Sequence, residues 1–286
     1  MRRFLLIACL WALAMPLAAQ GRLEQGQISA PFVLGKVETI PSAILKEQRL
    51  LNVYLPPGYS PDSAARYPVI YLLDGSADED FIHVVGLVQF FNFPWINQFP
   101  PSIVVGIANT SRKRDFTSPV ANLDFLEPLG FPKRGFEQAG GSEKFIAFIE
   151  KEVQPFVEKS YKVNYSKTII GQSLGGLLTT EILLKKPSLF DTYLILSPSL
   201  WWNKQALLRQ APALLQQQNK NNIKVYIGVG KEGKMMISDA EGLAQAIKKY
   251  RGASAQVVYD YLPNENHATM THQAIYNAFK RLYPAK

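Results

Sequence analysis

Short runs of apolar and β-branched residues alternate with amphipathic segments from residue 49 onward, and this alternation most limits what the chain can fold into. The runs that predict strands are 50–55, 69–73, 103–107, 167–170, 192–196, 224–229 and 256–262, with a further run at 36–40. The central runs are almost wholly apolar, which is typical of strands buried on both faces of a parallel sheet. The run at 36–40 suits an antiparallel edge strand. We therefore expect an α/β fold, with a mostly parallel sheet of about eight strands and helices on both faces.

The pentapeptide Gly171-Gln172-Ser173-Leu174-Gly175 joins one of these strands to a helical segment. A serine at such a strand-to-helix turn has its hydroxyl exposed above the sheet, and small residues must flank it because the turn is tight. The pattern alone recurs by chance in chains of this length. Its position between a strand and a helix makes Ser173 the candidate nucleophile.

A serine hydroxyl needs a base to remove its proton, and histidine is the usual one. The chain has three histidines. We expect His83 in a helix and His272 inside the last helix, whereas His267 lies in the expected loop between the last strand and the last helix. That loop is where a hydrolase with the chain order nucleophile, acid, base carries its histidine, so His267 is the predicted base.

The acid that orients the histidine should follow the penultimate strand, and Glu232 lies in that loop. Asp239 is the rival, although Ser238 and Glu241 have the spacing of a capping box, which would give Asp239 a structural role at a helix start. A dyad of Ser173 and His267 without an acid is also open.

An oxyanion needs two N–H donors, one from the residue after the nucleophile and one from an early strand-to-helix loop. Leu174 is the first. Asp74-Gly75-Ser76 ends an early strand, so the N–H of Ser76 is the second candidate; an ordinary turn is the alternative for Asp74-Gly75.

One segment, 109–141, resists regular assignment and contains Arg112, Arg114 and several prolines, glycines and phenylalanines. Loops of this length in a compact domain are usually functional or disordered. We expect a substrate-contacting cover, with a surface Ω-loop packed on its own aromatic residues as the alternative.

The N-terminus carries Arg2 and Arg3, an apolar stretch and then small residues, which predicts a signal peptide at 1–19 followed by one catalytic domain at 20–286. A membrane anchor is the alternative, but the apolar stretch is short for a bilayer span. Removal of this segment would take away the one cysteine, Cys9, and lower the formal net charge from +8 to +6. We expect a secreted or periplasmic protein without stable membrane insertion. The lysines and arginines are dispersed, which argues against nucleic-acid binding.

Together these features resemble the esterase D and enterochelin-esterase-like family of α/β-hydrolases. The resemblance rests on residues 51–59 (LNVYLPPGY), 71–75 (YLLDG), 112–115 (RKRD), 171–176 (GQSLGG), 197–202 (SPSLWW) and 266–267 (NH). It implies the α/β-hydrolase fold and carboxylic ester hydrolysis without metal or organic cofactor, with Ser173 and His267 matching the family's nucleophile and base. The family's acid is less uniform.

Substrates of the resembling family include siderophore trilactones, feruloyl or acetyl esters of polysaccharides and small thioesters. Arg112 and Arg114 match an arginine-containing segment of the siderophore-esterase branch, where they would face a polyanionic ferric catecholate; ion pairs at the rim are the alternative. Trp201 and Trp202 form a wall of the acyl or aryl pocket or belong to the core. An acyltransferase with the same triad and a catalytically silent ligand-binding protein remain competing hypotheses, and the oligomeric state is open.

Overall fold

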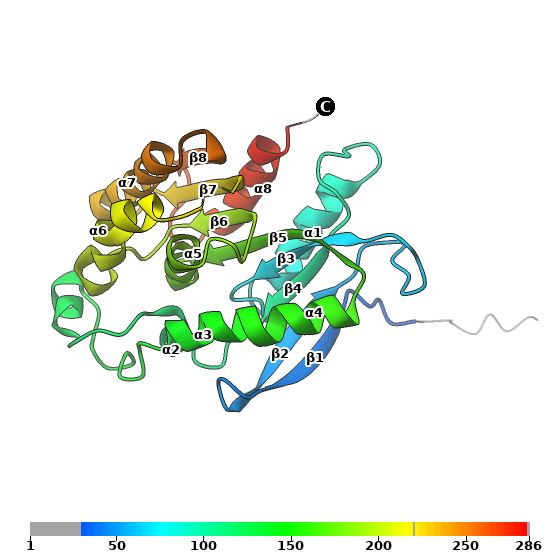
Figure 1. Ribbon diagram of the computed structural model, residues 1–286, viewed down its shortest axis with the longest axis horizontal. Helices are drawn as coiled ribbons and strands as arrows, with labels where there is room; N and C mark the ends of the chain where they lie inside the picture. Colours follow the sequence, from blue (N-terminus) through cyan, green and yellow to red (C-terminus); the bar gives the residue numbers. More distant parts are fainter. Residues whose placement is uncertain (1–29, 220, 285–286) are drawn as a thin grey trace, which may run out of the picture. The chain divides into compact units, whose positions relative to one another are not determined.

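The computed structural model describes residues 30–219 and 221–284 and contains an eight-stranded sheet with the order β1-β2-β4-β3-β5-β6-β7-β8 (Figure 1). The strands are β1 (Lys36–Ser42), β2 (Glu47–Tyr54), β3 (Tyr67–Leu72), β4 (Ile103–Ile107), β5 (Val163–Gln172), β6 (Thr192–Leu196), β7 (Ile223–Gly230) and β8 (Ala255–Leu262). Each overlaps one of the runs that the sequence marked as strands, so the predicted α/β fold is confirmed.

Strand direction places the functional edge of the sheet. β1 pairs with β2 and β2 with β4 in antiparallel fashion, whereas β4, β3, β5, β6, β7 and β8 are parallel neighbours. Parallel strands end at the same edge, and α/β sheets bind ligands outside those carboxyl ends. The loops after β3, β5, β6, β7 and β8 therefore meet at one edge.

Helices cover both faces of the sheet (Figure 1). One face packs against α1 (Phe81–Asn92) and α8 (Met270–Leu282); the other packs against α3 (Ser142–Phe148), η2 (Ile149–Val153), α4 (Gln154–Ser160), α5 (Leu174–Lys185), α6 (Trp202–Gln216) and α7 (Lys234–Arg251). β3 shows why both faces must be covered: Val69 and Tyr71 belong to one core cluster, and Ile70 and Leu72 to the other. Side chains alternate across a strand, so a wholly apolar strand supplies two cores.

The segment 109–141 holds only two short helices, α2 (Arg112–Phe116) and η1 (Asp124–Leu129). A last short turn, η3 (Gly252–Ser254), precedes β8. The capping box predicted at Ser238 is wrong, because α7 begins at Lys234 and the Ser238 hydroxyl donates to the carbonyl of Met235 within the helix.

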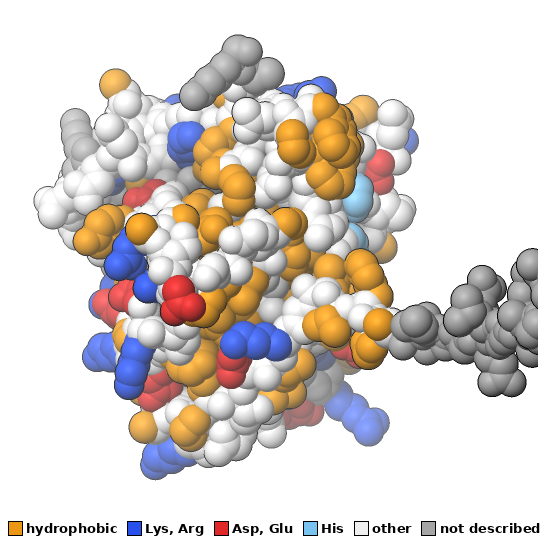
Figure 2. Space-filling model, turned by 90° about the vertical axis from the view of Figure 1, so that its right-hand side faces the viewer, with side chains coloured by type: hydrophobic (Ala, Val, Ile, Leu, Met, Phe, Trp, Pro, Cys, Tyr) orange, Lys and Arg blue, Asp and Glu red, His pale blue; other side chains and the backbone are white. Residues whose placement is uncertain are grey.

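The predicted signal peptide, residues 1–19, lies outside the described residues. Within 30–219 and 221–284, no helix has both the length and the hydropathy that crossing a bilayer requires. On the face shown in Figure 2, basic side chains are separated by hydrophobic and acidic ones and form no continuous basic surface.

Candidate active site

Ser173 stands at a strained turn between β5 and α5. Its φ is +61° and its ψ −119°, a conformation that residues with a Cβ rarely adopt. The turn is also closely packed: a Cβ at Gly171 would lie 2.4 Å from the carbonyl oxygen of Gly175, and one at Gly176 would lie 2.8 Å from that of Leu196. These contacts explain the glycines at positions 171 and 176, which flank the serine turn at the carboxyl edge of the sheet.

His267 lies in the loop between β8 and α8, at the same edge. Its Nε2 is 2.9 Å from the Ser173 Oγ, within hydrogen-bond distance. The Gln172 side chain donates to the backbone carbonyl of His267 at 2.9 Å, so the residue before the serine fixes the loop that carries the histidine. The imidazole remains half-exposed, at 46 % of its side chain. A base that faces both the serine and solvent can exchange protons with either.

Glu232 completes the chain of hydrogen bonds from the loop after β7. Its Oε2 is 2.5 Å from the His267 Nδ1, and its Oε1 accepts from the Ser197 hydroxyl and from the Gly230 N–H at 3.1 Å. The side chain is only 4 % exposed. Burial raises the pKa of this carboxyl, but the hydrogen bonds with His267 and Ser197 outweigh burial and leave the pKa below its ordinary value. Glu232 is therefore held as a carboxylate.

Asp239, the rival acid, lies on α7 and is not hydrogen-bonded to His267. Its Oδ1 accepts from the Gln205 side chain at 2.6 Å, and the residue is buried. Burial raises the pKa of this carboxyl. The structure thus brings Glu232, and not Asp239, to the histidine.

Of the two predicted oxyanion donors, the structure brings only Leu174 to the site. Leu174 begins α5, where backbone N–H groups have no partner inside the helix, and it lines the cavity next to Ser173. The N–H of Ser76 instead donates to a Glu79 carboxylate oxygen at 3.3 Å, and Ser76 does not line the cavity. The structure therefore does not place Ser76 at the cavity that contains the serine, which corrects the prediction for this residue.

Arg112 lies in the cavity lining and contacts the backbone just before the serine. Its Nε and Nη2 bind the two carboxylate oxygens of Asp74 at 2.6 and 2.9 Å, and Nη2 also donates to the carbonyl of Gln172 at 3.2 Å. Burial lowers the pKa of the guanidinium, but its hydrogen bonds to Asp74 and the nearby acidic charges raise the pKa above its usual value. The Arg112 guanidinium, paired with the Asp74 carboxylate, therefore lines the cavity and contacts Gln172, the residue before Ser173.

Arg114 lies elsewhere, which corrects its predicted contact with substrate. Its guanidinium pairs with Glu47 at 2.6 Å and with Asp115 at 2.7 Å. Asp115 in turn pairs at 2.8 Å with Arg49, whose side chain is fully buried. This network fastens α2 to β2, and Arg114 does not line the cavity.

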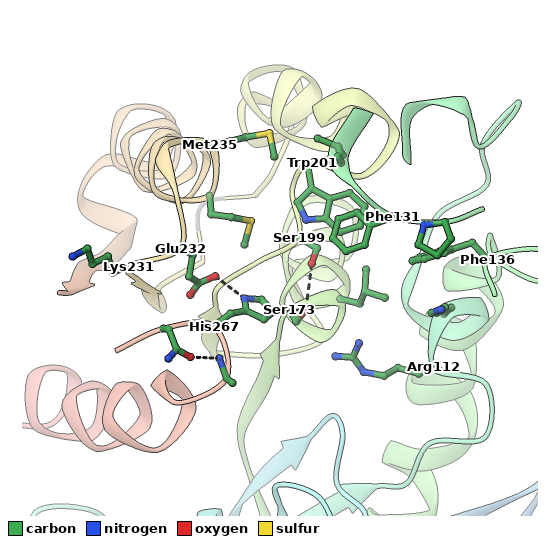
Figure 3. Close-up of a pocket in the computed structure, with 17 residues that line it drawn as sticks. Arg112, Phe131, Phe136, Ser173, Ser199, Trp201, Lys231, Glu232, Met235 and His267 are labelled. Atoms are coloured by element: carbon green, nitrogen blue, oxygen red, sulfur yellow. Dashed lines mark hydrogen bonds and ion pairs between the residues drawn. The ribbon is translucent and has the colours of Figure 1, made fainter. Parts of the chain in front are cut away.

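A cavity of about 810 Å³ opens over the serine (Figure 3). Its walls are aromatic, aliphatic and cationic, and consist of Arg112, Lys113, Leu129, Phe131, Pro132, Phe136, Ser173, Leu174, Ser199, Trp201, Lys231, Glu232, Met235, Met236, Asn266, His267 and Ala268. The segment 109–141 supplies six of these residues, from Arg112 to Phe136. Trp201 lines the cavity, whereas Trp202 is core: it is 2 % exposed and its indole N–H donates to the Ser118 carbonyl at 3.0 Å.

Two serines lie at the site that the sequence analysis did not predict there. Ser197, which binds Glu232, is fully buried with a φ of +39°, and the Ser199 hydroxyl lies 3.4 Å from that of Ser173. Both follow β6, the parallel neighbour of β5. The strand-end rule that located Glu232 and His267 could have found them. In the described part of the chain, no group of three or more histidine, cysteine or acidic side chains is arranged to hold a metal ion.

Comparison with known proteins places this site in a family. Residues 42–281 match the model of the esterase family, described as "Putative esterase". The chain is 33% identical over 211 residues to the ferri-bacillibactin esterase BesA of Bacillus subtilis, covering 71% of this chain and 72% of that protein. It is 39% identical over 113 residues to a siderophore enterobactin esterase of Emericella nidulans, covering 38% of this chain and 37% of that one.

Among solved structures, an IroE-like serine hydrolase from Shewanella oneidensis is similar to this chain. The TM-score is 0.79 at 28% identity, and the match covers 87% of this chain and 80% of that one. The fold, the hydrogen-bonded serine and the match over most of the chain agree with one another. The chain belongs to the esterase family and is an ester hydrolase of the α/β-hydrolase type.

Proposed function

We propose that Ser173 is the nucleophile of this esterase, that His267 is its general base and that Glu232 orients and stabilises the histidine. The observation that carries this proposal is the continuous hydrogen-bonded path from the Glu232 carboxylate through both imidazole nitrogens to the Ser173 hydroxyl. The path ends in a cavity large enough for a substrate.

The reaction follows from the position of each proton. With Nδ1–H donated to Glu232, the Nε2 of His267 has a free lone pair and accepts the Ser173 proton as Oγ attacks the ester carbonyl. The imidazolium returns that proton to the departing alcohol, which leaves an acyl-enzyme on Ser173. Water, deprotonated by the same nitrogen, then releases the acid and restores the serine.

Negative charge on the carbonyl oxygen needs stabilisation as the tetrahedral intermediate forms. The N–H of Leu174 at the start of α5 supplies one donor and the positive end of the helix dipole. Arg112 supplies a second positive group, since Asp74 and Gln172 hold its guanidinium at the cavity wall. We therefore assign to Arg112, and not to Ser76, the role of the second group that stabilises negative charge on the carbonyl oxygen.

The lining of the cavity favours a trilactone siderophore of the catecholate type as substrate. Phe131, Phe136 and Trp201 give the cavity an aromatic wall, and three basic residues in the lining attract the negative charge of a ferric catecholate: Arg112, Lys113 and Lys231. The names of the Bacillus and Emericella relatives agree with this choice. Feruloyl and acetyl esters, free or linked to polysaccharide, would place less negative charge in the cavity.

A panel of esters tests both the reaction and the substrate class: p-nitrophenyl butyrate, a feruloyl ester, an acetylated sugar and a catecholate trilactone with and without iron. We expect the trilactone to have the highest kcat/KM. Ser173→Ala should lower kcat by on the order of 10⁶. Retention of most activity in this variant would remove Ser173 from the mechanism.

The two competing functions are outcomes of the same panel. Added alcohols that are acylated in preference to hydrolysis would identify an acyltransferase. Tight binding of the trilactone without turnover would identify a binding protein. The hydrogen-bonded Ser173, His267 and Glu232 support turnover.

Export of the protein is a separate proposal, based on the sequence of residues 1–19. The expected mature chain begins near Gln20. Expression of the full chain in a Gram-negative host, followed by fractionation and intact-mass measurement, should find the shortened form in the periplasm or medium. A full-length chain held in the membrane fraction would favour the anchor instead.

A further inference from the structure

A smaller cavity, about 210 Å³, adjoins the cavity over Ser173. The two share three lining residues, Leu129, Trp201 and Met235. A side chain that lines both spaces separates them, so these three residues form a partition. Figure 3 shows Trp201 and Met235 at the end of the main cavity away from Arg112.

The smaller cavity is mainly apolar. Besides the partition it is lined by Phe125 and Pro128, with Lys204 and Gln205 as its polar members. Such walls suit a hydrocarbon chain or a single ring, because they offer few partners for a polar ligand. Met235 is an adaptable wall, since a thioether side chain fits several shapes and this one is 37 % exposed.

Trp201 is held in the partition from two sides. Its indole stacks on Phe131 with ring centroids 4.7 Å apart and an angle of 18°. The backbone after it forms a left-handed turn over Asn203, Lys204 and Gln205, with φ of 51°, 51° and 62°. Non-glycine residues rarely adopt this conformation. The Gln205 side chain donates to Asp239 on α7 at 2.6 Å, which anchors the turn that follows Trp201.

We propose that the smaller cavity is a subsite for an apolar chain or ring of the ester, and that Trp201 and Met235 determine how long a group can be accepted. This proposal rests on the proposed function of Ser173. In the structure the indole is one of the three side chains that line both spaces. Shortening either partition residue joins the two spaces and admits a longer group.

The test compares Trp201→Ala and Met235→Ala with the wild-type protein on two ester series. In the acyl series the leaving group is p-nitrophenol and the acid is acetate, butyrate, octanoate or 4-phenylbutyrate. In the alcohol series acetate is esterified with butanol, octanol or 4-phenylbutanol. Trp95→Ala is the matched control, because Trp95 is 76 % exposed after α1 and lines neither cavity.

Each methylene removed from water contributes roughly fourfold to kcat/KM. We therefore expect each partition variant to raise the ratio of octanoate to butyrate, or of the octyl to the butyl ester, by about tenfold or more. The series that responds shows whether the acyl or the alcohol part enters the subsite, and the phenyl compounds show whether it accepts a ring. The control should keep the wild-type ratios.

Unchanged ratios in both series for Met235→Ala and for a folded Trp201→Ala would overturn the subsite. Met235 is exposed, so its variant tests the proposal even where the tryptophan variant does not fold. Absence of ester hydrolysis by the wild-type protein would instead reject the proposed function. The two failures are therefore distinct.

Discussion

Glu232→Gln should trap His267 in the tautomer that cannot accept a proton. The Gly230 N–H can only donate, so the amide oxygen of a glutamine at 232 takes the position of Oε1, 3.1 Å from that nitrogen. The amide NH₂ then occupies the position of Oε2 and faces the His267 Nδ1. Nδ1 must accept this hydrogen bond, so the imidazole proton lies on Nε2. Nε2 faces the Ser173 hydroxyl and can then no longer accept its proton.

The expected loss in kcat is about 10⁴-fold, equivalent to about 5.5 kcal/mol of transition-state stabilisation, as found where an amide forces the same wrong tautomer in other serine hydrolases. The assay is p-nitrophenyl butyrate hydrolysis, with the downfield proton resonance of the Nδ1–H to carboxylate bond as a second readout. Thermal unfolding shows whether the variant is folded.

Glu265→Gln is the matched control, because it makes the same chemical change in the loop that carries His267 without touching the Glu232 hydrogen bonds. It should keep the wild-type kcat. A loss below about tenfold for Glu232→Gln in a folded protein would refute the tautomer argument and favour a dyad of Ser173 and His267.

Three further predictions concern the groups that hold this site. Ser197→Ala should lower kcat by about tenfold or more, because Glu232 loses a hydrogen-bond donor that lowers its pKa. The pH below which activity is lost should also rise. An unchanged pH profile would mean that Ser197 is only structural. Gly171→Ala should destabilise the fold by about 1–3 kcal/mol in thermal unfolding, because its Cβ meets backbone, whereas Gly86→Ala, in open space on α1, should be neutral or stabilising. Because the pKa of Glu232 is lowered in the folded state, its ionised form stabilises the folded protein above the ordinary pKa of 4.5, and this contribution is lost as the pH falls through the folded-state pKa. On acidification the free energy of unfolding of the wild-type protein should therefore fall relative to that of Glu232→Gln. A relative rise would contradict this sign.

The strands and the position of three site residues could be predicted because they depend on local pattern. Apolar runs with flanking turns define strands that are buried on both faces, and parallel strands end at one edge. Ser173, Glu232 and His267 each follow such a strand, so their proximity follows from topology alone. The two antiparallel pairings at β2 do not disturb this edge.

The sequence pattern could not predict which of the two arginines faces the cavity. Arg112 and Arg114 lie two residues apart on α2, and at 3.6 residues per turn their side chains point in nearly opposite directions. One can face the cavity only if the other faces away. Which of them does so depends on Glu47 and Asp115, whose contacts with Arg114 are long-range or buried and leave no periodic signal in the sequence.

Three residues at the carboxyl edge of the sheet have strained backbone conformations, and each positions one component of the site. Asp74, Ser173 and Ser197 follow the neighbouring strands β3, β5 and β6, and all three have positive φ without being glycine. Each holds one component: Asp74 binds Arg112, Ser173 carries the hydroxyl, and Ser197 binds Glu232. Such conformations cost about 1–3 kcal/mol each and persist only where the surrounding structure fixes them. The apolar strands beneath therefore do more than stabilise the fold, because their packing keeps three unfavourable turns, and with them the charge, the nucleophile and the acid, in register.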